Sequence, residues 1–121
     1  MKFYIKELAP GLNVMLRQHF RTRGCIRDRW TTEILAQREG GPINLRKVRI
    51  LIRRYFARNP LEIDNLYASA KIPLDALVRA GILLDDSLEV LLDLRMTQHK
   101  VARVYQEGTE IIVFNLEPPA I

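Results

Sequence analysis

Four acidic side chains lie at two turns of the chain, where carboxylates can meet a cation. Glu62 and Asp64 are two residues apart, just after a segment predicted to be a strand. Residues two apart in extended backbone project to the same side, so both carboxylates could reach one ion. Asp85 and Asp86 follow at the next turn, ahead of another predicted strand. Because Mg²⁺ prefers several carboxylate oxygens together with water, this spacing predicts a site for one or two such ions.

Each of these residues also has a plainer explanation. Acidic side chains at turns most often cap helices or form the turns themselves. Lys71 is seven residues after Asp64, close to the same face of a regular helix, so it could neutralise charge on a phosphate. It could equally be a solvated lysine that pairs with Asp75 at i+4. From the residues alone, the solvated or paired lysine is the favoured interpretation.

A helix is predicted between the two acidic turns. The pattern over 65–80 is helical, and Gly81 follows it as a favourable residue just beyond a helix C-terminus. Pro73 lies inside this stretch and should kink the helix or divide it in two, because proline has no N–H to donate. A helix that then folds back would bring the turn at 62–64 close to the turn at 85–86.

The remaining elements are mostly strands. They are predicted over 3–8, 45–58, 88–96 and 109–116, with a second helix over about 29–38 that Asp28 would cap. Within 45–58, apolar residues (Val48, Ile50, Ile52, Phe56) alternate with polar ones (Lys47, Arg49, Arg53, Tyr55). That strand should therefore have one apolar and one basic face. The apolar residues Leu88, Val90, Leu92, Leu94 and Met96 are likewise expected on one face.

The order of these elements predicts an α+β fold. A small mixed β-sheet, in the order β-α-β-α-β-β, would pack against two helices. A length of 121 residues suits one domain over 1–121.

Charge is unevenly distributed along the chain. Residues 1–60 carry 14 Lys or Arg and 4 Asp or Glu, whereas residues 61–121 carry 5 and 10. A basic half is typical of proteins that bind a phosphate backbone, although a solvated basic surface has the same composition. The candidate DNA contacts are Arg17, Arg21, Arg23, Arg27, Arg49 and Arg53.

Several other classes of protein are disfavoured. The single cysteine, Cys25, excludes an internal disulfide and suits a reducing cytoplasm. Cys25, His19 and His99 are scattered, so they do not have the spacing of a zinc site. The start of the chain has no apolar leader, and no apolar run is long enough for a membrane span. The expectation is a cytoplasmic protein with no membrane partner.

The segment from Glu62 to Ser87 resembles the core signature of RusA-like Holliday-junction resolvases. It contains Glu62-Ile63-Asp64-Asn65-Leu66, Lys71, Asp75-Ala76-Leu77, Ala80-Gly81-Ile82 and Asp85-Asp86-Ser87, in the family's order. Two details differ from the family pattern. Glu62 stands where the family usually has Asp, and about three more residues separate Asp64 from Asp86.

The resemblance implies a RusA-like endodeoxyribonuclease that depends on Mg²⁺, or on Mn²⁺, and cuts branched DNA such as a four-way junction. It implies a homodimer. It implies catalytic roles for Glu62, Asp64, Lys71 and Asp86, and metal binding by Glu62, Asp64 and Asp86 with Asp85 beside them. The alternative is a RusA-like protein that binds DNA but has lost catalysis.

Overall fold

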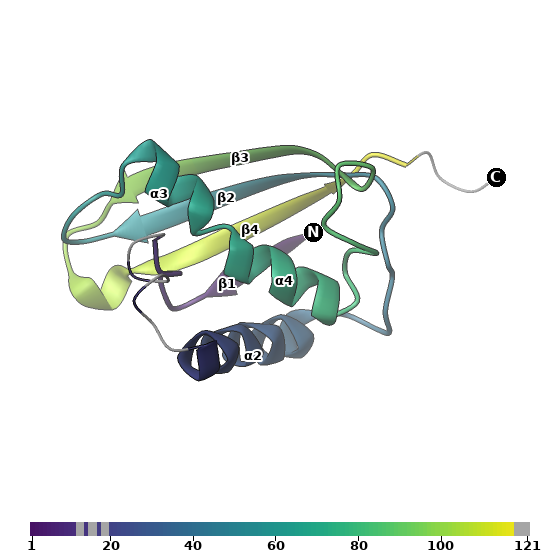
Figure 1. The fold of residues 1–121 in the computed structure, drawn as a ribbon, viewed down its shortest axis with the longest axis horizontal. Helices are drawn as coiled ribbons and strands as arrows, with labels where there is room; N and C mark the ends of the chain where they lie inside the picture. Colours follow the sequence, from purple (N-terminus) through teal and green to yellow (C-terminus); the bar gives the residue numbers. More distant parts are fainter. Residues whose placement is uncertain (12–13, 15–16, 18–19, 118–121) are drawn as a thin grey trace.

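Four strands form one mixed sheet in the computed structural model, which describes residues 1–11, 14, 17 and 20–117 (Figure 1). They are β1 (Lys2–Ile5), β2 (Val48–Phe56), β3 (Leu91–Lys100) and β4 (Gly108–Asn115), in the spatial order β1-β4-β2-β3. β4 runs antiparallel to both neighbours, whereas β3 runs parallel to β2. Parallel strands need a crossover connection, and here it contains two helices.

The described residues include three α-helices and one 3₁₀ helix. They are α2 (Phe20–Gln37), α3 (Ile63–Ala68) and α4 (Lys71–Arg79), with a short 3₁₀ helix, η1 (Val104–Gln106), ahead of β4. α2 lies beside β1 and α4 (Figure 1). The predicted α+β class, with a mixed sheet packed against helices, is confirmed. Within the same residues, no helix combines the length and the apolar character needed to cross a bilayer.

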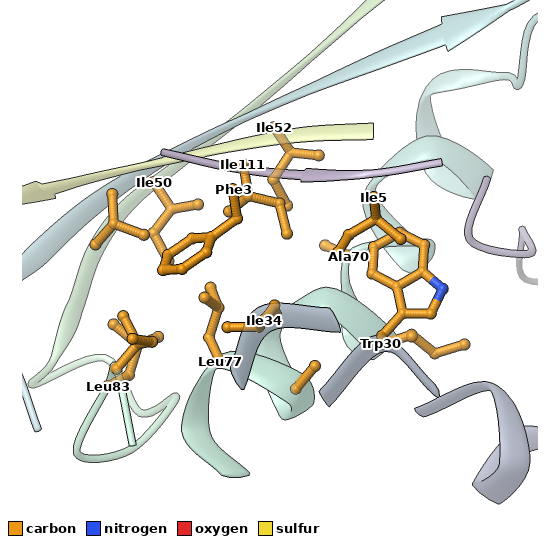
Figure 2. Packing of buried hydrophobic residues seen from close by; sticks show 14 of the residues in the cluster. Phe3, Ile5, Trp30, Ile34, Ile50, Ile52, Ala70, Leu77, Leu83 and Ile111 are labelled. Carbon is orange, nitrogen blue, oxygen red and sulfur yellow. The ribbon is translucent and has the colours of Figure 1, made fainter. Parts of the chain in front are cut away.

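The buried core lies between the helices and one face of the sheet. Three alternate residues of β2, Val48, Ile50 and Ile52, are at most 1% exposed. They face Trp30 and Ile34 of α2 and Leu77 of α4, as Figure 2 shows. Burial of one such side chain contributes roughly 1.5–3 kcal/mol, so this contact fixes which face of the sheet the helices cover.

The opposite face of the sheet is not buried. Its residues are Arg49, Leu51, Arg53 and Tyr55 on β2, Arg95, Thr97 and His99 on β3, and Glu110, Ile112 and Phe114 on β4. All of them are exposed or half-buried, and we call them the open face. The prediction that the second strand has one apolar and one basic face is therefore confirmed.

Helix α2 is longer than the sequence indicated. It begins at Phe20 rather than near residue 29, so the basic residues Arg21, Arg23 and Arg27 are also helical. Asp28 lies inside the helix and does not cap it; its carboxylate accepts a hydrogen bond from Arg79 Nη1 at 2.9 Å. The start was misplaced because the exposed arginines of the first turns have no apolar periodicity, although Ile26 packs against the core one turn before Trp30.

The helix expected over 65–80 is two helices, with a break at Ser69 and Ala70. Pro73 explains the position of the break. It has no N–H to bond to the carbonyl of Ser69, and its ring would clash with that carbonyl in a continuous helix. Gly81 ends α4 as predicted, with φ of 74°, and a Cβ at this position would lie 2.8 Å from Pro42 Cβ.

Strand β3 does not have the face predicted for it. Val48 pairs with Leu91 and Arg49 pairs with Asp93, so Leu92 is an extra residue that forms a bulge. A bulge reverses the alternation of side chains, and Leu92 is accordingly 52% exposed. Leu88 lies ahead of the strand and is 90% exposed. The expectation of one face from Leu88 to Met96 is therefore wrong.

Candidate functional site

Glu62 and Asp64 lie at the N-terminus of α3, in different backbone conformations. Glu62 is extended, with φ of −66° and ψ of 159°, and its carbonyl accepts the hydrogen bond of Leu66 N at 2.8 Å. Asp64 is in the first helical turn, where a negative charge is favoured by the helix dipole. The expectation that both residues project from one extended segment is wrong, because the helix starts between them at Ile63.

Asp85 and Asp86 lie in the connection from α4 to β3, just after a firmly held segment. The N–H groups of Ile43 and Asn44 both donate to Gly81 O at 2.9 Å, and Leu84 N donates to Leu45 O at 3.0 Å. These bonds fix the chain directly before the two acids. Asp86 N in turn donates to Asp85 Oδ1 at 2.8 Å.

Two of the predicted catalytic residues line one hollow of about 370 Å³. Lys71, at the start of α4, and Asp86 form its polar part. The other lining residues are Tyr67, Ala68, Ala70, Leu74 and Leu94. Asp64 is three residues before Tyr67 on α3, which is one helical turn along the same side. Glu62, Asp64 and Asp85 are not among the residues that line this hollow.

The candidate metal ligands are exposed and not committed to ion pairs. Within residues 1–11, 14, 17 and 20–117, no ion pair includes Glu62, Asp64, Asp85 or Asp86. Their carboxylate oxygens are the ligands that Mg²⁺ and Mn²⁺ prefer, so the residue types fit such an ion. The same part of the chain contains no group of three or more His, Cys, Asp or Glu side chains already placed to hold one.

Lys71 has the i+4 ion pair that the sequence allowed, and it also lines the hollow. It borders the hollow beside Asp86, and its Nζ lies 3.6 Å from Asp75 Oδ2, the i+4 partner. This pair is exposed on the lysine side, and exposed pairs of this kind contribute little to stability. The lysine can therefore exchange Asp75 for a phosphate at small cost.

The six arginines proposed as DNA contacts belong to two separate surfaces. Arg49 and Arg53 lie on the open face. Arg21, Arg23 and Arg27 lie on α2, in the helical layer beyond the opposite face, and Arg17 is exposed just ahead of α2. One straight DNA segment could not contact both groups at once.

Two polar residues that the sequence analysis missed lie near the first acidic pair. Arg54 is on the inner face of β2 and only 9% exposed; burial lowers its pKa, and Glu107 acts in the opposite direction. Its Nη1 donates to Gln98 Oε1 at 3.3 Å. Gln98 in turn bonds the backbone of Leu61, the residue before Glu62. A charged residue at an apolar position of the alternating strand was the available signal.

Comparison with known proteins finds no matching family model and no matching curated protein. The functional inference therefore depends on the residues of this chain and on their arrangement.

Proposed function

We propose that this protein is a metal-dependent endodeoxyribonuclease that cuts branched DNA in the manner of the RusA-like resolvases. The observation that carries the proposal is the hollow that Lys71 and Asp86 line together with Tyr67, which lies one helical turn after Asp64 on α3. A lysine and two carboxylates from separate elements are the groups that phosphodiester hydrolysis needs. The resemblance of residues 62–87 to the family signature supports the same chemistry.

The residues would divide the work as follows. Glu62, Asp64 and Asp86, with Asp85 beside them, would hold Mg²⁺ or Mn²⁺. Such an ion, when bound, neutralises charge on the phosphate and makes a water molecule more acidic. Lys71 would donate hydrogen bonds to a non-bridging phosphate oxygen, where negative charge increases during cleavage.

The substrate class follows from symmetry and charge. A four-way junction is two-fold symmetric and requires two matched cuts, which a C₂ homodimer could make with two identical sites. The arginines of α2 and of the open face would contact the phosphate backbone of different arms. Phosphate contacts carry no sequence information, so recognition would depend on the shape of the junction.

Cleavage of labelled synthetic DNA tests the proposal. Four-way, forked and linear substrates would be incubated with the protein and Mg²⁺, Mn²⁺ or EDTA. We expect paired nicks in the four-way junction with either metal, no product with EDTA, and far less cleavage of linear DNA. Equal cleavage of all three substrates would reject the branched-DNA assignment, and no metal-dependent cleavage of any would reject the nuclease.

The second candidate is a DNA-binding protein of the same type without catalysis. One observation favours it: the described part of the chain has no preassembled group of three metal-binding side chains. Salt-sensitive junction binding by a protein that cleaves nothing in Mg²⁺ or Mn²⁺ would select this alternative.

A further inference from the structure

The side chain of Gln98 holds the backbone of Leu61 at two points. Leu61 N donates to Gln98 Oε1, and Gln98 Nε2 donates to Leu61 O, both at 2.8 Å. A primary amide can make this pair of bonds because it has a donor and an acceptor side by side. Gln98 on β3 thus bonds the loop between β2 and α3 much as a neighbouring strand would.

Arg54 orients this amide. Its Nη1 donates to the same Gln98 Oε1 at 3.3 Å, and the guanidinium has no acceptor atom. A reversed amide would direct its NH₂ group at the guanidinium and at Leu61 N–H, and both donors would lose this acceptor. Because Arg54 is only 9% exposed, it has little access to water as an alternative partner.

These hydrogen bonds restrict the backbone on both sides of Glu62. Leu61 is fixed on one side by Gln98, and the carbonyl of Glu62 is fixed on the other by Leu66 N at 2.8 Å. Leu61 is also packed: a Cβ on Gly11 would lie 3.3 Å from Leu61 Cδ2. The backbone of Glu62 is therefore held from both directions, and only its side-chain torsions are left to adjust.

We propose that Gln98, oriented by Arg54, is a positioning residue that holds Glu62 for metal binding. The inference rests on the proposed function, because it assumes that Glu62 is a metal ligand. A longer Glu at this place has more rotamers than an Asp, so a fixed backbone reduces what must be ordered when an ion binds. Partners that orient a metal ligand typically change metal affinity about 10- to 100-fold when removed.

The chain contains a matched control. Gln37 on α2 bonds Tyr4 of β1 in the same two-point way, with Tyr4 N donating to Oε1 at 2.9 Å and Nε2 donating to Tyr4 O at 2.7 Å. These two hydrogen bonds use the backbone groups of Tyr4 at the free edge of β1, and they do not involve Glu62. Gln37→Leu therefore removes the same chemistry from a place where no metal ligand depends on it.

The experiment compares Gln98→Leu and Gln98→Glu with Gln37→Leu in the full chain. Amide hydrogen exchange at Leu61 would be measured by NMR without metal, Mn²⁺ affinity by calorimetry, and junction cleavage across a Mg²⁺ titration. We expect Gln98→Leu to speed exchange at Leu61 at least about 10-fold and to weaken Mn²⁺ binding about 10-fold. Excess Mg²⁺ should restore most of the cleavage rate, with junction affinity unchanged.

Gln98→Glu keeps the acceptor for Leu61 N–H and for Arg54 but loses the donor to Leu61 O, so its effects should be intermediate. It also keeps the test decisive if Gln98→Leu fails to fold. Gln37→Leu should speed exchange at Tyr4 and leave Mn²⁺ affinity within about twofold of the parent.

Parental Mn²⁺ affinity in folded Gln98→Leu or Gln98→Glu, with the parent still cleaving junctions, would overturn the positioning role alone. If the parent neither binds Mn²⁺ nor cleaves, the proposed function is overturned as well. Amide hydrogen exchange at Leu61 distinguishes these two outcomes, because it reports the Gln98–Leu61 hydrogen bonds in the absence of metal.

Discussion

The candidate metal ligands and the open face of the sheet differ in how their charges are paired. Glu62, Asp64, Asp85 and Asp86 are exposed and have no ion pair within the described part of the chain. On the open face, Glu110 lies 3.2 Å from Arg53 and 3.8 Å from Lys2. Arg95 similarly lies 3.2 Å from Asp93, and the Arg49 guanidinium is 5.0 Å from the centre of the Phe114 ring.

This difference separates two tasks. Unpaired carboxylates are available for a cation, and removing one should affect cleavage more than binding. Paired arginines on an exposed sheet can exchange a weak ion pair for a phosphate, and removing one should affect binding more than cleavage. Variants of the candidate ligands and of the open face should therefore have opposite effects on cleavage and binding.

The largest effect is expected at Asp64. In Asp64→Asn the amide is a poorer ligand for Mg²⁺ and has no charge, so junction cleavage should fall on the order of 1,000-fold. Junction binding should persist or tighten, because a repulsion against phosphate is removed. Single-turnover cleavage and a gel-shift titration on one preparation measure both quantities. Equal losses of binding and cleavage would contradict the separation of tasks.

Glu62 gives the next largest effect and tests the identity of the ligand. Glu62→Gln should lower cleavage on the order of 100-fold, because one negative ligand is lost. Glu62→Asp keeps the carboxylate and should retain activity within about tenfold of the parent. Rates across a Mg²⁺ titration distinguish the two variants. If both variants cleave as the parent does, Glu62 is not a ligand.

Lys71 should have a smaller effect, and Asp75 provides its control. Lys71→Ala removes a donor to the phosphate and should lower kcat about 10- to 100-fold. Asp75→Asn breaks the same ion pair without removing that donor, so cleavage should change less than twofold. Were Lys71 only a surface partner of Asp75, both variants would leave kcat unchanged and shift stability by less than about 0.5 kcal/mol.

The smallest effects are expected on the open face, and they should have opposite signs. Arg53→Ala should weaken DNA binding about three- to tenfold and reduce the log–log salt slope by about 0.9. Glu110→Gln frees Arg53 and Lys2 from their ion pairs, so it should tighten binding. Salt titrations by fluorescence anisotropy, with junction and linear DNA in parallel, measure both variants. Unchanged affinity and an unchanged salt slope in both variants would mean that this face does not contact DNA.

The sequence predicted those features that depend on local pattern. Alternation in β2 placed Ile50 inward and Arg49 outward, and Pro73 indicated a division of the second helix. The sequence-based prediction was wrong where a tertiary contact determines the local structure. The bulge at Leu92 depends on how β3 pairs with β2. The early start of α2 depends on the packing of Ile26 against the core.

The two hydrogen bonds between Gln98 and Leu61 could not be predicted from the local sequence pattern. Gln98 and Leu61 are 37 residues apart, and their contact exists only once β3 is in place. Arg54 did leave a trace in the sequence, since it breaks the apolar alternation between Ile52 and Phe56. A charge at such a position indicates a buried polar contact, although not which residue will accept it.

The most direct test of the metal site is a crystal structure with Mn²⁺, located by anomalous scattering. We predict a peak in which carboxylate oxygens of Asp64 and Asp86 lie about 2.2 Å from the ion, with Glu62 completing the protein ligands. The same preparation must cleave junctions with Mn²⁺ in solution. An active protein whose crystals bind Mn²⁺ away from these carboxylates, or not at all, would contradict the assignment of the site.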